Sequence, residues 1–358
     1  MGRANLLARL LAPRYRVHVV GLRFGDDVWG PTRDDGIEVR SIDGTRYPRL
    51  TGRLSKLARM ADGDILLASK ARPTSFGLAL LARRQRPRPL VLDIDDWELG
   101  FFLRSGIAGT VGRAVNVSNP NGLPWTWLME RLTKRADAIT VGSRFLQRRF
   151  GGTLIPHVRD TDAWQPGRFD REAARAALGA GHRRVVMFLG TPRGHKGVDD
   201  LIDAVGTLGE QVVVAVVGAD LRGASARRWS AMPHVKVFGE VPFDDAPRWL
   251  IGADVVAVPH RDTPDTVGQV PAKIFDAMAL ARPLVSTSVS MIPEILDGCG
   301  IVVPPGDVPA LASAIRRLLD DPNGAAALGL RARARCESDY SYHAARARLF
   351  PLLEKLAP

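Results

Sequence analysis

Residues Ala253 to Asp307 combine side chains and backbone features that suit a phosphorylated ligand. An apolar run ends at Pro259, a polar loop follows, and a helix that carries Lys273 and Asp276 opens near Pro271. Free N–H groups and the dipole at a helix N-terminus favour anions, and a loop at the carboxyl end of a strand delivers the ligand there. The backbone donors predicted for the phosphate are those of Gln269, Val270 and Ala272.

A second loop of this kind lies earlier, in FLGTPRGHKGVDDLIDAV, residues 188–205. An apolar run ends at Gly190, and Lys196 opens the next helix. Cationic side chains form strong charge-assisted bonds with phosphate, so Arg193 and Lys196 are predicted to bind the phosphate groups of a ligand, with His195 beside them. The alternative is a solvated turn between a strand and a helix.

Three carboxylates stand at the end of another apolar run, in LVLDIDDWELGFF, residues 90–102. On a strand Asp93 and Asp95 face the same way, while Asp96 turns into the loop. A metal-binding Asp-x-Asp and a phosphatase nucleophile both fit the surrounding residues poorly. Asp95 or Asp96 is predicted to contact a substrate; the alternative is that Asp96 caps a helix.

Apolar runs of strand length alternate with helix-length segments in two series, which predicts an α/β protein with two Rossmann-like parallel-sheet domains. The predicted strands are 16–21, 37–42, 64–69, 90–94, 138–142 and 153–156, then 184–190, 211–218, 235–239, 254–259, 283–287 and 300–303. The predicted domains are 1–165 and 166–341, followed by a helix over 342–358.

Composition agrees with two folded domains, since 46% of the 358 residues are hydrophobic and 25% are charged. The net charge of +12 is uneven: residues 1–165 hold 27 Lys and Arg against 16 Asp and Glu, which gives +11. Two cysteines without a CxxC spacing, no apolar run of membrane-spanning length and no signal-peptide pattern at the start predict a cytoplasmic protein.

The two glycine loops and the helix with Lys273 and Asp276 resemble the donor-binding region of retaining glycosyltransferases of the GT-B fold, family 4 (glycosyl transferases group 1). The resemblance implies two Rossmann-like domains that face an interdomain cleft, with a C-terminal helix that crosses back to the first domain. It also implies transfer of a sugar from a nucleoside-diphosphate donor to an acceptor hydroxyl with retention, without a catalytic metal.

The resemblance assigns roles to the second half residue by residue. Asp276 takes the place of a glutamate that holds the ribose, and Lys273 matches a P-x-K variant of the motif. Gly268 stands where a first glutamate is usual and has no side chain to contact the transferred sugar, so the choice of donor is open. Asp262 or Asp265 is an alternative contact for that sugar. Thr191 replaces a usual arginine after Gly190, for which Arg193 is the predicted substitute. Backbone after the strand over 235–239, at Glu240 and Val241, is expected at the base.

In the first half, the resemblance implies a strand upstream of Gly2, which would be central to the sheet. The alternative is a sheet that closes with five strands. The acceptor is expected near Gly2, Asp95 and Asp96.

Residues 48–60, PRLTGRLSKLARM, predict a basic amphipathic helix. Such a helix can lie on an anionic membrane surface, so the protein is expected to be cytoplasmic, with peripheral docking at the inner face of the membrane as one interpretation. A solvated helix is the ordinary alternative, and no nucleic-acid motif accompanies the basic residues. The membrane-contact candidates are Arg49, Arg53, Lys56 and Arg59.

The sequence therefore predicts a hexosyltransferase of cell-surface glycan, glycolipid or secondary-metabolite glycosylation, whose acceptor is a glycan, a lipid-linked or a small molecule. One alternative is a nucleotide-sugar 2-epimerase-like enzyme, which should carry further carboxylates and a histidine in the cleft. The other is a non-catalytic nucleotide-sugar-binding protein.

Overall fold

The structure is a computed structural model that describes residues 2–25, 36–103, 116–264 and 266–357. It divides into two compact units. The first unit consists of Met1–Pro156, Val267–Gln269 and Ala345–Pro358, and the second of His157–Thr266 and Val270–Ala344. The domain boundary that the sequence predicts, after residue 165, lies within the second unit.

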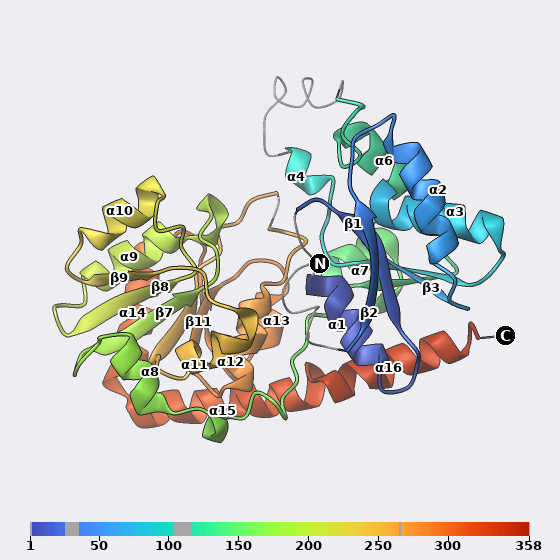
Figure 1. The fold of residues 1–358 in the computed structure, drawn as a ribbon. Helices are drawn as coiled ribbons and strands as arrows, with labels where there is room; N and C mark the ends of the chain where they lie inside the picture. Colours follow the sequence, from blue (N-terminus) through green and yellow to red (C-terminus); the bar gives the residue numbers. More distant parts are fainter. Residues whose placement is uncertain (1, 26–35, 104–115, 265, 358) are drawn as a thin grey trace. The chain divides into compact units, whose positions relative to one another are not determined.

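Each apolar run predicted in the first half contributes a strand, of which Figure 1 labels β1, β2 and β3. Within the described residues, β1 (His18–Arg23) and β2 (Glu38–Asp43) form a two-stranded parallel sheet. A four-stranded parallel sheet has the order β3 (Leu66–Ser69), β4 (Leu90–Ile94), β5 (Ala138–Val141) and β6 (Thr153–Leu154). The strand expected upstream of Gly2 stays a prediction.

Helix α2 (Leu50–Met60) of the first unit packs on the sheet through an apolar face. In α2, Leu50, Leu54 and Leu57 are buried and join a core with Phe76 and the strands of the four-stranded sheet. The final helix starts in the second unit and belongs to the first from Ala345 on. That final helix is α16 (Tyr342–Glu354), and besides α2 the other helices of this unit are α1 (Gly2–Leu11), α3 (Leu78–Gln85), α4 (Gly100–Leu103), α6 (Leu123–Arg131) and α7 (Arg144–Phe150).

A buried ion pair fixes α1 to the four-stranded sheet. Arg3 donates from Nε and Nη2 to both oxygens of Asp93, at 2.9 and 2.8 Å, and its side chain is 2% exposed. The same guanidinium donates to the carbonyls of Ile155 and Pro156, after β6. Thr140 Oγ1 adds a third bond to Asp93. Both charges are therefore satisfied although neither reaches water.

The second unit is a six-stranded parallel sheet with helices on both faces (Figure 1). Its order is β12 (Ile301–Val303), β11 (Leu284–Thr287), β10 (Val255–Val258), β7 (Arg184–Leu189), β8 (Val212–Val217) and β9 (Val235–Phe238). The strands are almost wholly apolar because both faces are covered. One face shares a core with α9 (Val198–Gly206), α10 (Ala224–Ser230) and α14 (Val308–Asp320). The remaining helices are α8 (Arg171–Ala177), α11 (Ala246–Leu250), α12 (Ala272–Ala279), α13 (Ile292–Leu296) and α15 (Pro322–Asp339).

The strand order reverses between β7 and β10. From β7 the chain moves outward through β8 to β9, and from β10 it moves the opposite way through β11 to β12. The loops after β7 and β10 therefore begin side by side at the carboxyl edge before the chain runs in opposite directions along the sheet, and parallel sheets bind ligands at such a point. Both predicted phosphate loops meet at this point.

The buried pair generates a stability prediction. Substituting Arg3→Met leaves Asp93 buried without its counter-charge, which costs about 3–5 kcal/mol of the free energy of unfolding. The control is Arg23→Met, which removes an exposed pair with Asp43 and costs about 0–1 kcal/mol. Urea denaturation of both variants measures the difference; equal losses would contradict a dominant role for the buried pair.

Candidate functional site

Two glycines allow the loops at the strand reversal to touch. Gly190, at the end of β7, has φ +115°, and Gly197, at the start of α9, has φ +63°, both in the region that favours glycine. A Cβ atom at Gly190 would lie 2.5 Å from Lys273 Nζ, and one at Gly197 would lie 1.9 Å from the carbonyl oxygen of Pro259. The loop after β7 is thereby seated directly on the loop after β10 and on α12.

Lys273 brings a positive charge into this contact. Its Nζ lies 4.3 Å from the centroid of the Phe188 ring and is buried, and among the described residues no hydrogen-bond acceptor meets it. Lys196, from the loop after β7, is its neighbour and donates to the carbonyl of Thr191 at 2.6 Å. The structure thus brings together Gly190, Thr191, Arg193, Lys196 and Lys273, as the sequence predicts.

Burial and the repulsion between like charges disfavour the charged forms of Lys196 and Lys273. Burial lowers the pKa of Lys273 well below its usual range, Lys196 lowers it further, and Asp276 opposes both. Burial, followed by Arg193, lowers the pKa of Lys196 to about 8. An unpaired buried ammonium raises the free energy of the folded state until an anion compensates it. The arrangement can therefore bind a polyanion with little competition from internal carboxylates.

Two histidines line the same loops. His195 is 6% exposed and His260 is 3% exposed, and their rings lie edge to face with centroids 6.0 Å apart. Burial, followed by Lys273, lowers the pKa of His260 to about 3, so this ring is neutral near neutral pH. His195 is therefore placed as predicted, in the loop with Lys196, while His260 was not predicted to be there.

Helix α12 contributes backbone donors. Its N-cap is Pro271, whose side chain makes no capping bond, and within the described residues no side-chain acceptor is seen for the first N–H groups of the helix, from Ala272 on. Val270, just before it, is 6% exposed. These positions match the predicted phosphate cradle.

Asp276 is bound by an arginine that the sequence did not reveal. Arg159 Nε donates to Asp276 Oδ1, and the two side chains are 8% and 6% exposed. Arg159 lies shortly after β6, in the segment LIPHVRD. The available signal was only its position shortly after a strand end. One oxygen of Asp276 is therefore used inside the second unit.

Glu240 and Val241 follow β9 at the same carboxyl edge, with Glu240 exposed and Val241 half-buried. Phe243, two residues on, packs against Trp164 with ring centroids 5.7 Å apart. The segment predicted for the base thus adjoins the aromatic residues around Arg159.

Gly268 and Gln269 belong to the first unit. The Gly268 carbonyl accepts a bond of 2.9 Å from Ser143 Oγ, and a Cβ atom there would lie 3.1 Å from Trp97 Cβ. A glutamate at 268 would therefore force Trp97 or the backbone to shift. The roles predicted for Gly268 and Gln269 stay predictions, and Asp265 lies outside the described residues.

Asp95 and Asp96 share a lysine that was also missed. Lys70 Nζ lies 3.2 Å from Asp95 Oδ1 and 3.2 Å from Glu98 Oε1, and it pairs with Asp96 Oδ2. Lys70, just after β3, has φ +78°, a rare backbone conformation for a residue other than glycine. Burial and Asp95 raise the pKa of Asp96 despite Lys70.

The remaining predicted residues lie elsewhere in the first unit. Gly2 is exposed at the start of α1, next to the buried Arg3. The predicted basic helix is α2, with three exposed cations, while Arg53 is half-buried and donates to the carbonyl of Asp43. Across the described ranges, the helices are too short or too polar to cross a membrane. The exposed cations are Arg49, Lys56 and Arg59.

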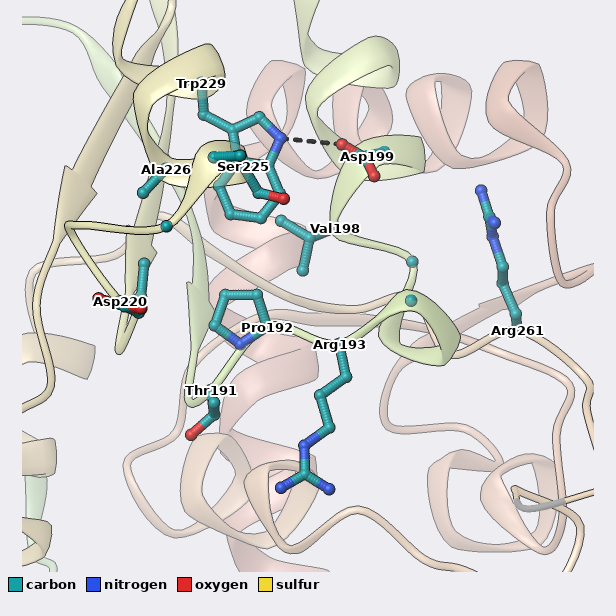
Figure 2. Close-up of a pocket in the computed structure, with 15 residues that line it drawn as sticks. Thr191, Pro192, Arg193, Val198, Asp199, Asp220, Ser225, Ala226, Trp229 and Arg261 are labelled. Atoms are coloured by element: carbon teal, nitrogen blue, oxygen red, sulfur yellow. Dashed lines mark hydrogen bonds between the residues drawn. The ribbon is translucent and has the colours of Figure 1, made fainter. Parts of the chain in front are cut away.

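A cavity of about 320 Å³ lies on the α9 and α10 side of the loop after β7. Figure 2 shows Pro192, Val198 and Trp229 around it, with the Trp229 indole donating to Asp199 at 2.8 Å. Arg193 lines the cavity at the edge of the loop.

Comparison with known proteins identifies the family. The profile of the Glycosyl transferases group 1 matches residues 183–321, and that of a Glycosyl transferase 4-like domain matches residues 3–161. A GDP-mannose-dependent alpha-(1-6)-phosphatidylinositol monomannoside mannosyltransferase of Mycolicibacterium smegmatis is 28% identical over 86% of this chain and 80% of its own length. The alpha-D-kanosaminyltransferase of Streptomyces kanamyceticus is 33% identical over 43% of this chain and 42% of its own.

Among solved structures, Anabaena HepE in complex with UDP superposes with a TM-score of 0.77 at 19% identity, covering 99% of this chain and 97% of that one. This likeness shows the fold. The chain therefore belongs to the glycosyl transferases group 1, built on the GT-B fold, and is a glycosyltransferase that uses a nucleotide-sugar donor.

Proposed function

We propose that this protein is a retaining hexosyltransferase whose second unit binds the diphosphate of the donor with Lys196, Lys273, Arg193 and the N-terminus of α12. One observation carries the proposal: the Lys273 ammonium is buried beside Lys196, and within the described residues it has no acceptor. A diphosphate supplies the missing negative charge, and it gains charge as the sugar departs, so the same cations stabilise the transition state.

The rest of the donor follows from this placement. Asp276 accepts bonds from the ribose hydroxyls, and the backbone at Glu240 and Val241 meets the base. Gly190, Thr191 and His195 border the phosphates. The sheet supports this placement of base, ribose and phosphates, since β7, β9 and the start of α12 share one carboxyl edge.

Catalysis proceeds without a metal in this proposal, because side-chain cations perform the neutralisation. Among the described residues, no group of three His, Cys, Asp or Glu side chains is close enough to share a metal ion. The acceptor hydroxyl attacks the face from which the diphosphate leaves, and the leaving phosphate takes the proton. Asp95, Asp96 and Gly2 are the acceptor-side residues.

The acceptor we propose is a glycan, a lipid-linked or a small hydroxylated molecule, in keeping with the names of the mannosyl- and kanosaminyltransferase relatives. The basic residues of α2 bring the protein to the inner face of an anionic membrane.

A panel of UDP-, GDP- and ADP-sugars tests the function. Slow release of the sugar with its anomeric configuration retained, followed by NMR, is the expected result. Inverted product would overturn the retaining mechanism, and an epimerised nucleotide sugar would overturn transfer.

Substituting Lys273→Met removes the buried charge and keeps the length of the side chain. We expect kcat/KM for the preferred donor to fall by about 10–100-fold, because a charge-assisted bond contributes about 1.5–3 kcal/mol. The free variant should also melt at a higher temperature than wild type, since the uncompensated charge is gone. Lys236→Met, on β9, is the matched control and should do neither. A Lys273→Met variant with full turnover would refute the phosphate role.

Donor affinity should depend on pH. The pKa of Lys196 lies near 8, so its positive charge is present below this value and is lost as the pH rises through it. We expect Kd for a nucleoside diphosphate to rise by about tenfold between about pH 7 and about pH 9.5, by linkage. Calorimetry on wild type and on Lys196→Arg, which keeps its charge throughout, measures the effect. Identical pH profiles would contradict this assignment.

Replacing Arg49, Lys56 and Arg59 together by serine should weaken binding to vesicles rich in anionic phospholipid. Each basic residue near such a surface contributes about 1 kcal/mol, so a loss of about 100-fold is expected, with binding suppressed by salt. Serine at the exposed Arg222, Arg227 and Arg248 is the control. Co-sedimentation that is equal for both triple variants would rule out docking through α2.

A further inference from the structure

Arg159 is held by contacts on every side of its guanidinium. Nε donates to Asp276 Oδ1, Nη1 donates to the Val158 carbonyl at 2.8 Å, and Nη2 approaches the Ala272 carbonyl at 3.4 Å. Its side chain is 8% exposed. A planar fork fixed at three points cannot rotate, so the direction in which it presents Asp276 is fixed too.

Two aromatic rings flank the same group. The guanidinium carbon lies 5.6 Å from the centroid of Trp164 and 5.4 Å from that of Phe243. Phe243 follows Glu240 and Val241, the segment proposed for the base, while Ala272 begins α12. Arg159 therefore joins the ribose carboxylate, the base segment and the start of the phosphate helix.

We propose that Arg159 is the positioning residue for the nucleoside half of the donor. This inference rests on the proposed function of the same site. Aspartate is one methylene shorter than the glutamate of the resembled motif, and Arg159 compensates by holding Oδ1 and presenting the remaining oxygen to the ribose diol.

Arg333 provides a comparison for an arginine that only anchors these elements. Arg333, on α15, also ties the segment around Trp164 to α12: it donates to the carbonyls of Trp164 at 2.9 Å and Thr161 at 3.2 Å, and to that of Ala279. Arg333 and Arg159 thus join the same two elements, but only Arg159 is bonded to Asp276. Arg333→Met is accordingly the matched control for anchoring without positioning.

The contacts separate the nucleoside from the diphosphate. Arg159 touches Asp276 and Phe243, whereas Lys273 and Lys196 border Gly190 and Thr191. Inorganic pyrophosphate occupies the second set alone. The ratio of the two dissociation constants, for a nucleoside diphosphate and for pyrophosphate, therefore isolates the nucleoside contribution.

Isothermal titration of UDP, GDP and pyrophosphate into wild type, Arg159→Met, Arg333→Met and Lys273→Met tests the proposal. Arg159→Met should weaken the preferred nucleoside diphosphate by about tenfold, as for loss of a charged hydrogen-bond network, and leave pyrophosphate within about twofold. It should raise KM for the donor with kcat nearly unchanged. Arg333→Met should keep the wild-type ratio of the two dissociation constants even if it lowers Tm.

A double-variant cycle with Asp276→Ala completes the test. If Arg159 acts through Asp276, the double variant binds the nucleoside diphosphate no more weakly than Asp276→Ala alone. Additive losses, a wild-type ratio in Arg159→Met, or an equal change of ratio in Arg333→Met would each overturn the proposal. Failure of the proposed function is distinguishable, because it would show as unaltered pyrophosphate binding in Lys273→Met.

Discussion

The buried ammonium of Lys273 is the constraint around which the second unit is organised. It lies against a glycine that has no room for a side chain, over an aromatic ring and beside a second lysine. Such an arrangement is costly in the free protein, and the sheet maintains it because the loops after β7 and β10 are forced together where the strand order reverses. In the proposed function, a diphosphate supplies the negative charge that compensates this ammonium.

Buried charges elsewhere in the chain show the contrast. Arg3 and Asp93 satisfy each other with additional bonds from carbonyls and a threonine, which suits a structural role. Lys70 is surrounded by three carboxylates, and Arg159 by a carboxylate and two carbonyls. Lys273 differs because its electrostatic neighbours include cations that oppose it. The proposed diphosphate site therefore coincides with a buried charge that has no hydrogen-bond acceptor among the described residues.

The sequence predicted the strands well because buried parallel strands are unbroken apolar runs. The run predicted over 90–94 coincides with β4, and the run predicted over 184–190 is β7, which ends one residue earlier, at Leu189. Lys196 and Lys273 were brought together correctly because both follow strand ends that neighbour each other in the sheet. The fold and the approach of these two lysines to each other were therefore predictable, while their role at a diphosphate stays a prediction.

Side-chain partners were not predictable in the same way. Arg159 and Asp276 are 117 positions apart, and nothing in either segment points to the other. Lys70 pairs with Asp95 and Asp96 from a left-handed backbone conformation, which no periodicity in the sequence predicts. The alternation of a strand predicted that Asp93 and Asp95 face the same way, yet Asp93 forms an ion pair with Arg3 and Asp95 forms one with Lys70. Such pairings depend on loop geometry, which pattern does not encode.

Proton uptake on ligand binding tests the central claim most directly. At about pH 8.5 a nucleoside diphosphate is fully ionised, so any proton taken up must come to the protein, and linkage makes the uptake a measure of raised lysine pKa values. Calorimetry in buffers of different ionisation enthalpy should show clear uptake in wild type and less in Lys273→Met. Binding of the nucleoside diphosphate without proton uptake would contradict the account, because the lysines would then already be charged and compensated in the free protein.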